Sequence, residues 1–151
     1  DFISKILYLI SKIKNMYPQE MVLPMQAELT AVGFQDLHSA EAVDAAIKAE
    51  GTTLVVVNSV CGCAARNARP GSAMSLDNAK KPDHLITVFA GVDKDAVDAA
   101  RQHMFPFPPS SPSIALFKDG ELVHMLERHH IEGRPAEMIA DNLKDAFNEY
   151  C

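Results

Sequence analysis

The feature that most constrains this chain is a pair of cysteines placed directly after a run of β-branched residues. Thr53-Leu54-Val55-Val56-Val57 is a short, continuous apolar run, which is typical of a strand buried on both faces. Cys61-Gly62-Cys63 follows within four residues, and a helix-forming stretch begins at Ala64. The two cysteines are too close in sequence to link distant parts of the chain, so we expect them to do chemistry or to bind metal.

The rest of the chain alternates between helical and strand-like periodicity. The strand–helix–strand succession around the cysteines requires parallel pairing, and Asp119-Gly120 between two β-prone runs predicts a hairpin that adds antiparallel strands. Ser39 and Asp93 are the expected N-caps of the helices that follow them. The sequence therefore predicts an α/β fold with a mixed central β-sheet flanked by α-helices on both faces. We expect helices over 20–32, 39–50, 64–76 (kinked or broken at Pro70-Gly71), 93–104 and 135–150, and further strands over 85–89, 114–117 and 121–125.

The first fifteen residues form a segment of a different kind. Apolar residues recur there with lysines between them, but the longest apolar run is too short for a membrane span or a secretory signal. We expect either an amphipathic helix on a partner or membrane surface, or an extension that precedes a natural start at Met16, and we favour the extension. The predicted organisation is an N-terminal extension, 1–15, and one folded domain, 16–151.

Charge and cysteine usage exclude several classes of function. The formal net charge is −6, from 14 Lys+Arg against 20 Asp+Glu, which argues against binding to nucleic acid or to an anionic membrane. Three cysteines are too few for a disulfide scaffold, so we expect a reducing, cytoplasmic setting.

The position of Cys61 favours a nucleophilic thiolate. The N–H groups and the dipole of the predicted helix stabilise an anion at its start. Arg66 and Arg69 lie within two turns of Cys61, and the chain has no carboxylate between Val60 and Leu76. Each feature should lower the pKa of the Cys61 thiol, and Cys63 is then the expected resolving thiol.

The one-residue spacing affects what this pair can do. A Cys61–Cys63 disulfide closes a ring of about eleven atoms with its Cα atoms near the upper end of the usual range, and Gly62 supplies dihedral freedom for that ring. We expect a strained, easily reduced bond, suited to exchange of mixed disulfides or to isomerisation rather than to bulk reduction. The alternatives are inert buried cysteines, half of a metal site completed by histidines or by a second chain, or a non-enzymatic interaction module that uses the cysteine pair.

The residues around the cysteines resemble the signature of the bacilliredoxin family. The resemblance implies a thioredoxin-like fold with no bound cofactor, and removal of bacillithiol from mixed disulfides on S-thiolated cytoplasmic client proteins. Weak disulfide isomerase activity is associated with some members. By position, Cys61 would take bacillithiol from the client, and Cys63 or a second bacillithiol would release it. The matching segments are 57–65, 68–70, 24–30, 33–34, 110–113, 131–133 and Cys151, within an overall resemblance over 17–151.

Further expectations follow from a thioredoxin-like layout. A cis-proline precedes the strand that faces the thiols in such folds, which predicts a cis bond at Ser111-Pro112 and a Ser111 backbone that is offered to an extended substrate. We expect Arg128 or His129 to stabilise the thiolate or contact substrate, with a solvated His129-His130 surface pair as the alternative. Compared with thioredoxins, the cysteine spacing is one residue shorter and strand 53–57 has no buried carboxylate. We expect no essential role for the terminal Cys151.

Overall fold

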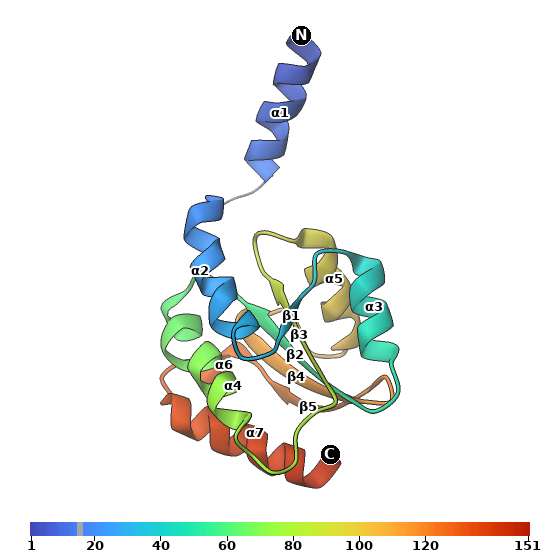
Figure 1. Ribbon diagram of the computed structural model, residues 1–151, viewed down its shortest axis with the longest axis vertical. Helices are drawn as coiled ribbons and strands as arrows, with labels where there is room; N and C mark the ends of the chain where they lie inside the picture. Colours follow the sequence, from blue (N-terminus) through green and yellow to red (C-terminus); the bar gives the residue numbers. More distant parts are fainter. Residues whose placement is uncertain (15–16) are drawn as a thin grey trace.

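The computed structural model describes residues 1–14 and 17–151, which are arranged around one five-stranded sheet (Figure 1). The elements follow the chain as α1 (Phe2–Lys14), α2 (Gln19–Thr30), β1 (Gln35–Asp36), α3 (Ala40–Lys48), β2 (Thr52–Asn58), the π-helix η1 (Ala64–Ala68), α4 (Arg69–Ser75), β3 (His84–Phe89), α5 (Lys94–His103), β4 (Ser113–Lys118), β5 (Glu121–Leu126), α6 (Arg128–Ile131) and α7 (Ala136–Tyr150).

The sheet is mixed, as the sequence predicts. Its strand order is β1-β3-β2-β4-β5, in which β1, β3 and β2 pair parallel, β4 pairs antiparallel to β2, and β5 pairs antiparallel to β4. Asp119 and Gly120 both have positive φ, which matches the two-residue turn expected of an Asp-Gly hairpin. β1 is not predicted from the sequence, because its two residues are polar and too few to show any periodicity.

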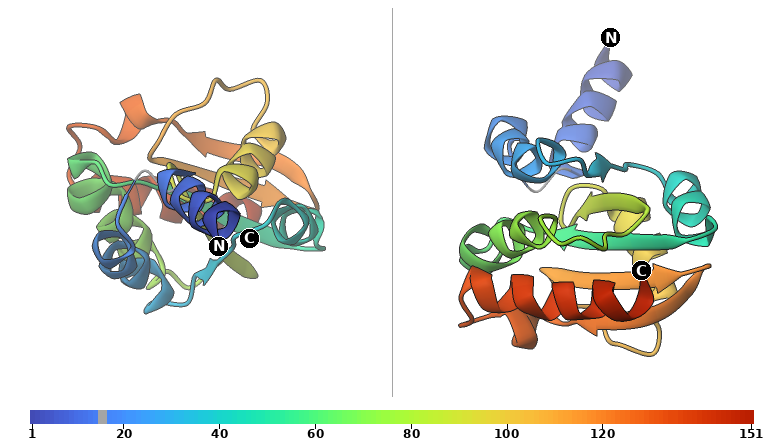
Figure 2. Two further views of the ribbon diagram at one scale, coloured as in Figure 1. Left: turned by 90° about the horizontal axis from the view of Figure 1, so that it is seen from above. Right: turned by 60° about the horizontal axis from the view of Figure 1, so that its bottom comes forward.

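The continuous apolar run of β2 is explained by helices on both faces of the sheet (Figure 2). Val55 and Val57 face a core that includes side chains of α3 and α5, whereas Leu54 and Val56 face a core that includes side chains of α2 and α7. All four side chains are fully buried. Because β2 lies at the centre of both cores, its end is a rigid place from which to project the cysteines.

Of the kink or break predicted at Pro70-Gly71, the structure excludes the break. The helix is continuous there: η1 runs directly into α4, and the Arg69 N–H bonds to the Ala64 carbonyl, five residues back. Pro70 has no backbone N–H that needs an acceptor. The wider π turn before it shifts the hydrogen-bond pattern without interrupting the helix. Gly71 then allows α4 to approach α7, since a Cβ there would stand 2.7 Å from Cγ2 of Ile139.

The two predicted N-caps behave differently. Ser39 caps α3, because its Oγ accepts a hydrogen bond from the Ala42 N–H at 3.2 Å. Asp93 occupies the N-cap position of α5, but its carboxylate makes no capping bond and instead lies 3.0 Å from Nδ1 of His38. The prediction of side-chain capping by Asp93 is therefore wrong, because its carboxylate interacts with His38, which is distant in sequence.

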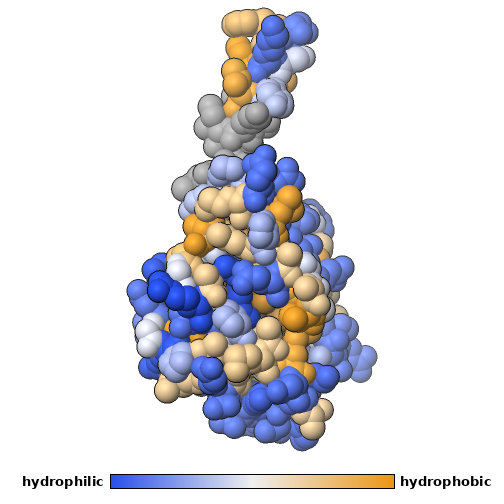
Figure 3. Space-filling view, turned by 60° about the vertical axis from the view of Figure 1, so that its left-hand side comes forward, coloured by the Kyte–Doolittle hydropathy of each residue, from blue (hydrophilic) through white to orange (hydrophobic). Residues whose placement is uncertain are grey.

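The N-terminal segment forms a helix that projects from the rest of the chain (Figure 1). Its apolar residues Phe2, Ile3 and Leu7 are exposed, and apolar and charged residues occupy opposite sides of α1 (Figure 3). Across the described residues, no helix combines the length and the apolar character that crossing a bilayer requires. The predicted natural start at Met16 lies outside the described residues, so the domain boundary stays a prediction.

Candidate active site

The two cysteines form a disulfide at the end of β2, where the following helix begins. Their Cα atoms are 5.5 Å apart, within the common range for disulfides, so the expected position near its upper end is wrong. The Cys61 carbonyl accepts hydrogen bonds from the N–H groups of Ala64 and Ala65, at 3.0 and 3.2 Å. Cys61 therefore starts the helix, and both cysteine residues are half-buried.

Gly62 has a different role from the one expected. It is helical and its φ is not in the positive region, so the ring does not use a conformation restricted to glycine. A Cβ on Gly62 would instead lie 2.6 Å from Nη2 of Arg66. The missing side chain therefore leaves room for the Arg66 guanidinium to lie against the Cys-Gly-Cys segment, and the predicted proximity of Arg66 to the cysteines is confirmed.

Arg69 is buried and paired, which corrects its predicted role as a free cation beside Cys61. Its side chain is 2% exposed, and its Nε lies 2.6 Å from Oε2 of Glu28 on α2. Its Nη1 donates to Oδ1 of Asn58 and to the carbonyl of Ser59, both at 2.9 Å. Arg69 therefore fixes the loop between β2 and Cys61, while Glu28 compensates its charge.

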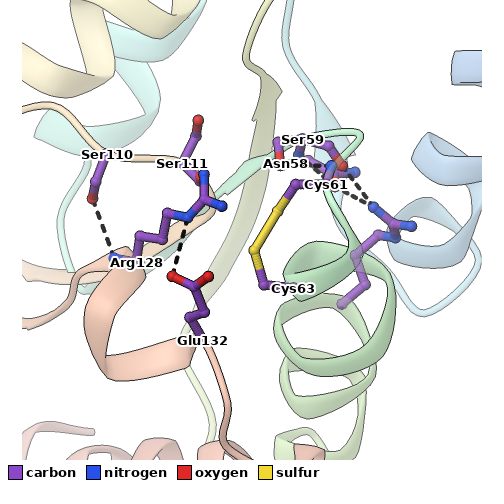
Figure 4. Close-up of a disulfide and its surroundings, with 9 residues drawn as sticks. Asn58, Ser59, Cys61, Cys63, Ser110, Ser111, Arg128 and Glu132 are labelled. Atoms are coloured by element: carbon purple, nitrogen blue, oxygen red, sulfur yellow. Dashed lines mark hydrogen bonds and ion pairs between the residues drawn. A yellow bond between two sulfur atoms is a disulfide. The ribbon is translucent and has the colours of Figure 1, made fainter.

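Arg128 faces the disulfide from α6, on the opposite wall of the site (Figure 4). Its Nη1 donates to the Ser111 carbonyl at 3.3 Å, and its backbone N–H donates to Ser110 Oγ at 3.3 Å. Its Nε lies 3.5 Å from Oε2 of Glu132. The segment between Val60 and Leu76 has no carboxylate, but the site does have one, because the tertiary structure brings Glu132 to it.

Ser111 and Pro112 lie beside the strand that leads to the cysteines. The bond between them is cis, which confirms the prediction. The register of β4 against β2 pairs Ser113 with Val57, so the segment before Ser113 lies next to the end of β2. Ser111 is half-buried and Pro112 is buried.

His129 lies apart from the cysteines. Its side chain is 70% exposed and stands 3.7 Å from the Glu127 carboxylate, and it does not line the cavity beside the disulfide. Burial and the neighbouring His129 lower the pKa of His130, whose ring belongs to the capping of α6. Of the two residues, Arg128 lines the cavity beside the disulfide and His129 is exposed, as in the alternative interpretation. The role of Arg128 toward the thiolate or the substrate stays a prediction.

The cysteines open onto a cavity of about 490 Å³. One wall is the Cys-Gly-Cys segment with η1, and the other is the chain that joins α6 to α7. The side chain of Asn67 donates a hydrogen bond to the Arg134 carbonyl, which ties the two walls together. The lining residues are Cys61, Gly62, Cys63, Arg66, Asn67, Arg128, Glu132, Gly133, Arg134 and Pro135.

The potential metal ligands of this chain lie away from the cysteines. Over residues 1–14 and 17–151, the two groups of three close ligand side chains are Glu127, His129 and His130, and Asp36, His38 and Asp93. Neither group contains a cysteine, so histidines of the same described chain do not complete a metal site at Cys61 and Cys63.

Cys151 is separated from the cavity by the length of α7. It is exposed and follows Tyr150, whereas Pro135, at the other end of that helix, lines the cavity. Fifteen helical residues span roughly 22 Å, so an intramolecular Cys61–Cys151 disulfide is incompatible with this fold.

Known proteins resemble this chain over nearly its whole length. The family model described as disulphide isomerase matches residues 17–151. A bacilliredoxin of Cytophaga hutchinsonii is 60% identical over 89% of this chain and 99% of its own, and one of Shouchella clausii is 54% identical over 89% and 94%. Among solved structures, a mutant thioredoxin of Halobacterium salinarum superposes with a TM-score of 0.54 at 18% identity, over 79% of this chain and 91% of its own.

These similarities agree with the site geometry. The structural neighbour establishes the thioredoxin-like fold, and the relatives establish the chemistry of a thiol–disulfide oxidoreductase. That chemistry needs a thiol that can attack a disulfide, and the Cys61–Cys63 pair supplies it. The chain belongs to the bacilliredoxin family.

Proposed function

We propose that this protein removes bacillithiol from mixed disulfides on client proteins, with Cys61 as the nucleophile. The observation that supports this most directly is the placement of the Cys61–Cys63 pair at a helix start, beside an open cavity lined by arginines. The Cys61 thiolate attacks the bacillithiol sulfur, and the client leaves as a thiolate. A Cys61–bacillithiol disulfide results.

The second half of the reaction removes bacillithiol from Cys61. The Cys63 thiolate, or a second bacillithiol, attacks the mixed disulfide and releases bacillithiol or its disulfide. When Cys63 does this, the product is the Cys61–Cys63 disulfide of the present structure, two electrons more oxidised than the dithiol. A separate thiol must then reduce it. No bound cofactor is needed, and we expect a reducing, cytoplasmic setting.

Ser111 is suited to hold an extended client segment. Its carbonyl accepts one hydrogen bond from Arg128 and retains a second lone pair, and it belongs to the segment beside the end of β2. A client backbone N–H can therefore bond there while its disulfide reaches Cys61.

Mass spectrometry of a Cys63→Ser variant tests this function. The variant is mixed with a bacillithiolated client, and we expect the bacillithiol mass on Cys61 together with a free client thiol. A Cys61→Ser variant should lose the reaction, and activity that survives this change would disprove the role of Cys61. If nothing transfers while Cys61 still reacts with a generic disulfide, the bacillithiol assignment fails and general exchange remains.

Disulfide isomerase is the second candidate function. The family model that matches residues 17–151 is described by that activity. An isomerase refolds a scrambled disulfide protein catalytically without an external reductant, so a refolding assay with the reduced protein distinguishes the two functions.

A further inference from the structure

The cavity beside the disulfide is positively charged although the whole chain is acidic. Its lining includes Arg66, Arg128 and Arg134 against the single carboxylate of Glu132. The formal net charge of the chain is −6, so a cationic cavity is not a consequence of overall composition. A local excess of positive charge in a concave site attracts anions.

Two of the three arginines are free to bind a ligand. Arg128 lies 3.5 Å from Glu132 and also donates to Ser111, so its charge is compensated within the wall (Figure 4). Within the described part of the chain, neither Arg66 nor Arg134 forms an ion pair. Arg66 lies against Gly62, between the two cysteines in sequence, and Arg134 stands on the facing wall.

The size of the cavity indicates a small ligand. A volume of about 490 Å³ is within the range of small-molecule sites. Guanidinium groups bind carboxylates and phosphates through paired N–H donors. The ligand that fits is a small thiol with a carboxylate or similar anionic group a few bonds from its sulfur.

We propose that Arg66 and Arg134 form an anion subsite that holds the small-thiol half of a mixed disulfide against Cys61. This inference rests on the proposed function and assigns the residues that direct Cys61 to the small-thiol sulfur. With the small thiol in the cavity, its sulfur is the one that Cys61 attacks. The bond between the two substrate sulfurs breaks, the Cys61 sulfur bonds to the small thiol, and the client leaves with the electron pair as a thiolate.

Two probes that differ in one charge test the subsite. A neutral cysteine peptide is linked through a disulfide either to 3-mercaptopropionate, which is anionic, or to 2-mercaptoethanol, which is neutral. Each reacts with the full chain carrying Cys63→Ser and Cys151→Ser, and mass spectrometry gives the rate and identity of the adduct on Cys61. The anionic-to-neutral rate ratio is divided by the same ratio for free dithiothreitol, which removes the intrinsic reactivity of the probes.

The expected ratio is about tenfold at low salt, the effect of two solvent-exposed ion pairs at the strong end of their range. It should fall toward one at high salt. Arg66→Gln and Arg134→Gln should each lower it about threefold, and the ratio cancels any change in thiolate reactivity common to both probes. Lys118→Gln is the matched control, because this exposed residue lies at the far end of β4 from Ser113.

The outcomes separate the subsite from the function. Small-thiol adducts that form faster with the anionic probe, and lose this preference in the Arg66→Gln/Arg134→Gln double variant, support the subsite. Equal normalised rates, a preference that survives the double variant, or adducts of the peptide on Cys61 overturn the subsite while thiol exchange stands. No adduct with either probe overturns the proposed function as well.

Discussion

Arg69 and Glu28 are separated by 41 positions in sequence, yet Arg69 Nε and Glu28 Oε2 lie 2.6 Å apart. This ion pair joins α2 to the start of α4, which follows η1 after the cysteines. The same guanidinium holds Asn58 and Ser59, so three segments meet at one buried side chain. The position of Cys61 therefore depends on contacts that lie behind it, outside the cavity.

Replacing Arg69 should destabilise the protein more than replacing Arg66. We expect Arg69→Ala to lower the free energy of unfolding by about 2–3 kcal/mol, because it removes buried charge-assisted hydrogen bonds. Arg66 is exposed, and Arg66→Ala should cost less than about 0.5 kcal/mol. Urea unfolding of both variants provides the measurement, and equal losses would contradict the assignment of Arg69 as the structural arginine.

The two helical glycines near the site should respond differently to alanine. A Cβ on Gly71 meets Ile139 and the Ala136 carbonyl, which packing holds in place, so Gly71→Ala should cost about 1–3 kcal/mol. A Cβ on Gly62 meets only the end of the Arg66 side chain, which can move, so Gly62→Ala should leave the stability unchanged or raise it by up to about 1 kcal/mol. Thermal unfolding compares the two. A large loss of stability in Gly62→Ala would show that glycine is needed there for the backbone.

Reduced Cys61 should titrate below the ordinary thiol pKa of about 8.5. It stands at a helix start with Arg66 close by, and both features favour the thiolate. The rate of iodoacetamide alkylation against pH measures this in a Cys63→Ser, Cys151→Ser background. Arg66→Gln should move the titration to higher pH, and a Cys61 pKa at or above 8.5 would contradict the nucleophile assignment.

The His38–Asp93 contact should make a small, pH-dependent contribution to stability. Burial opposes the charged imidazolium, but the hydrogen bond to Asp93 and the charges of Asp93 and Asp36 outweigh it and raise the pKa of His38. Since the folded pKa is raised, the stabilisation is complete below about pH 6.5 and is lost as the pH rises through the folded pKa. His38 is 60% exposed, so the effect should stay below about 1 kcal/mol.

A double-mutant cycle isolates that contribution. Burial raises the pKa of Asp36 as well, whereas burial and His129 lower the pKa of His130. The pH dependence of the stability of the whole protein therefore combines opposing contributions. In the coupling energy between His38→Gln and Asp93→Asn, the contributions of titratable groups that all four proteins share cancel. It should be favourable at about pH 5.5 and near zero at about pH 9. A coupling energy that does not change with pH would contradict the ion pair.

Removing α1 should leave the rest of the fold intact. The apolar residues of this helix that the structure describes are exposed, so its deletion uncovers little of the core. We expect a chain without residues 1–14 to unfold within about 0.5 kcal/mol of the full chain in urea. A loss above about 1 kcal/mol would show that α1 belongs to the folded domain.

Periodic apolar residues and turn signals were sufficient to predict most of the fold. The run at Val55–Val57 identified the central strand, and Asp119-Gly120 identified the hairpin, because each signal is local and strong. β1 and α6 were missed because two- and four-residue elements have too short a pattern to recognise. Pro70-Gly71 predicts a kink or a break, and the break is absent because the upstream π turn keeps the helix continuous.

The linear order of residues was enough to identify the chemistry, since Cys61 and Cys63 are neighbours in sequence and their place between strand and helix is a local property. Which charged side chains surround the thiols depends on the tertiary structure. Glu28 compensates Arg69 from 41 positions away, and Arg128 and Glu132, a pair four residues apart, reach the cavity from a distant part of the chain. Charge counts near Cys61 in sequence therefore do not describe the charge near it in space. Electrostatic interactions depend on distance through space, and among the residues that the structure describes no carboxylate forms an ion pair with Arg66 or Arg134, which line the cavity beside the disulfide.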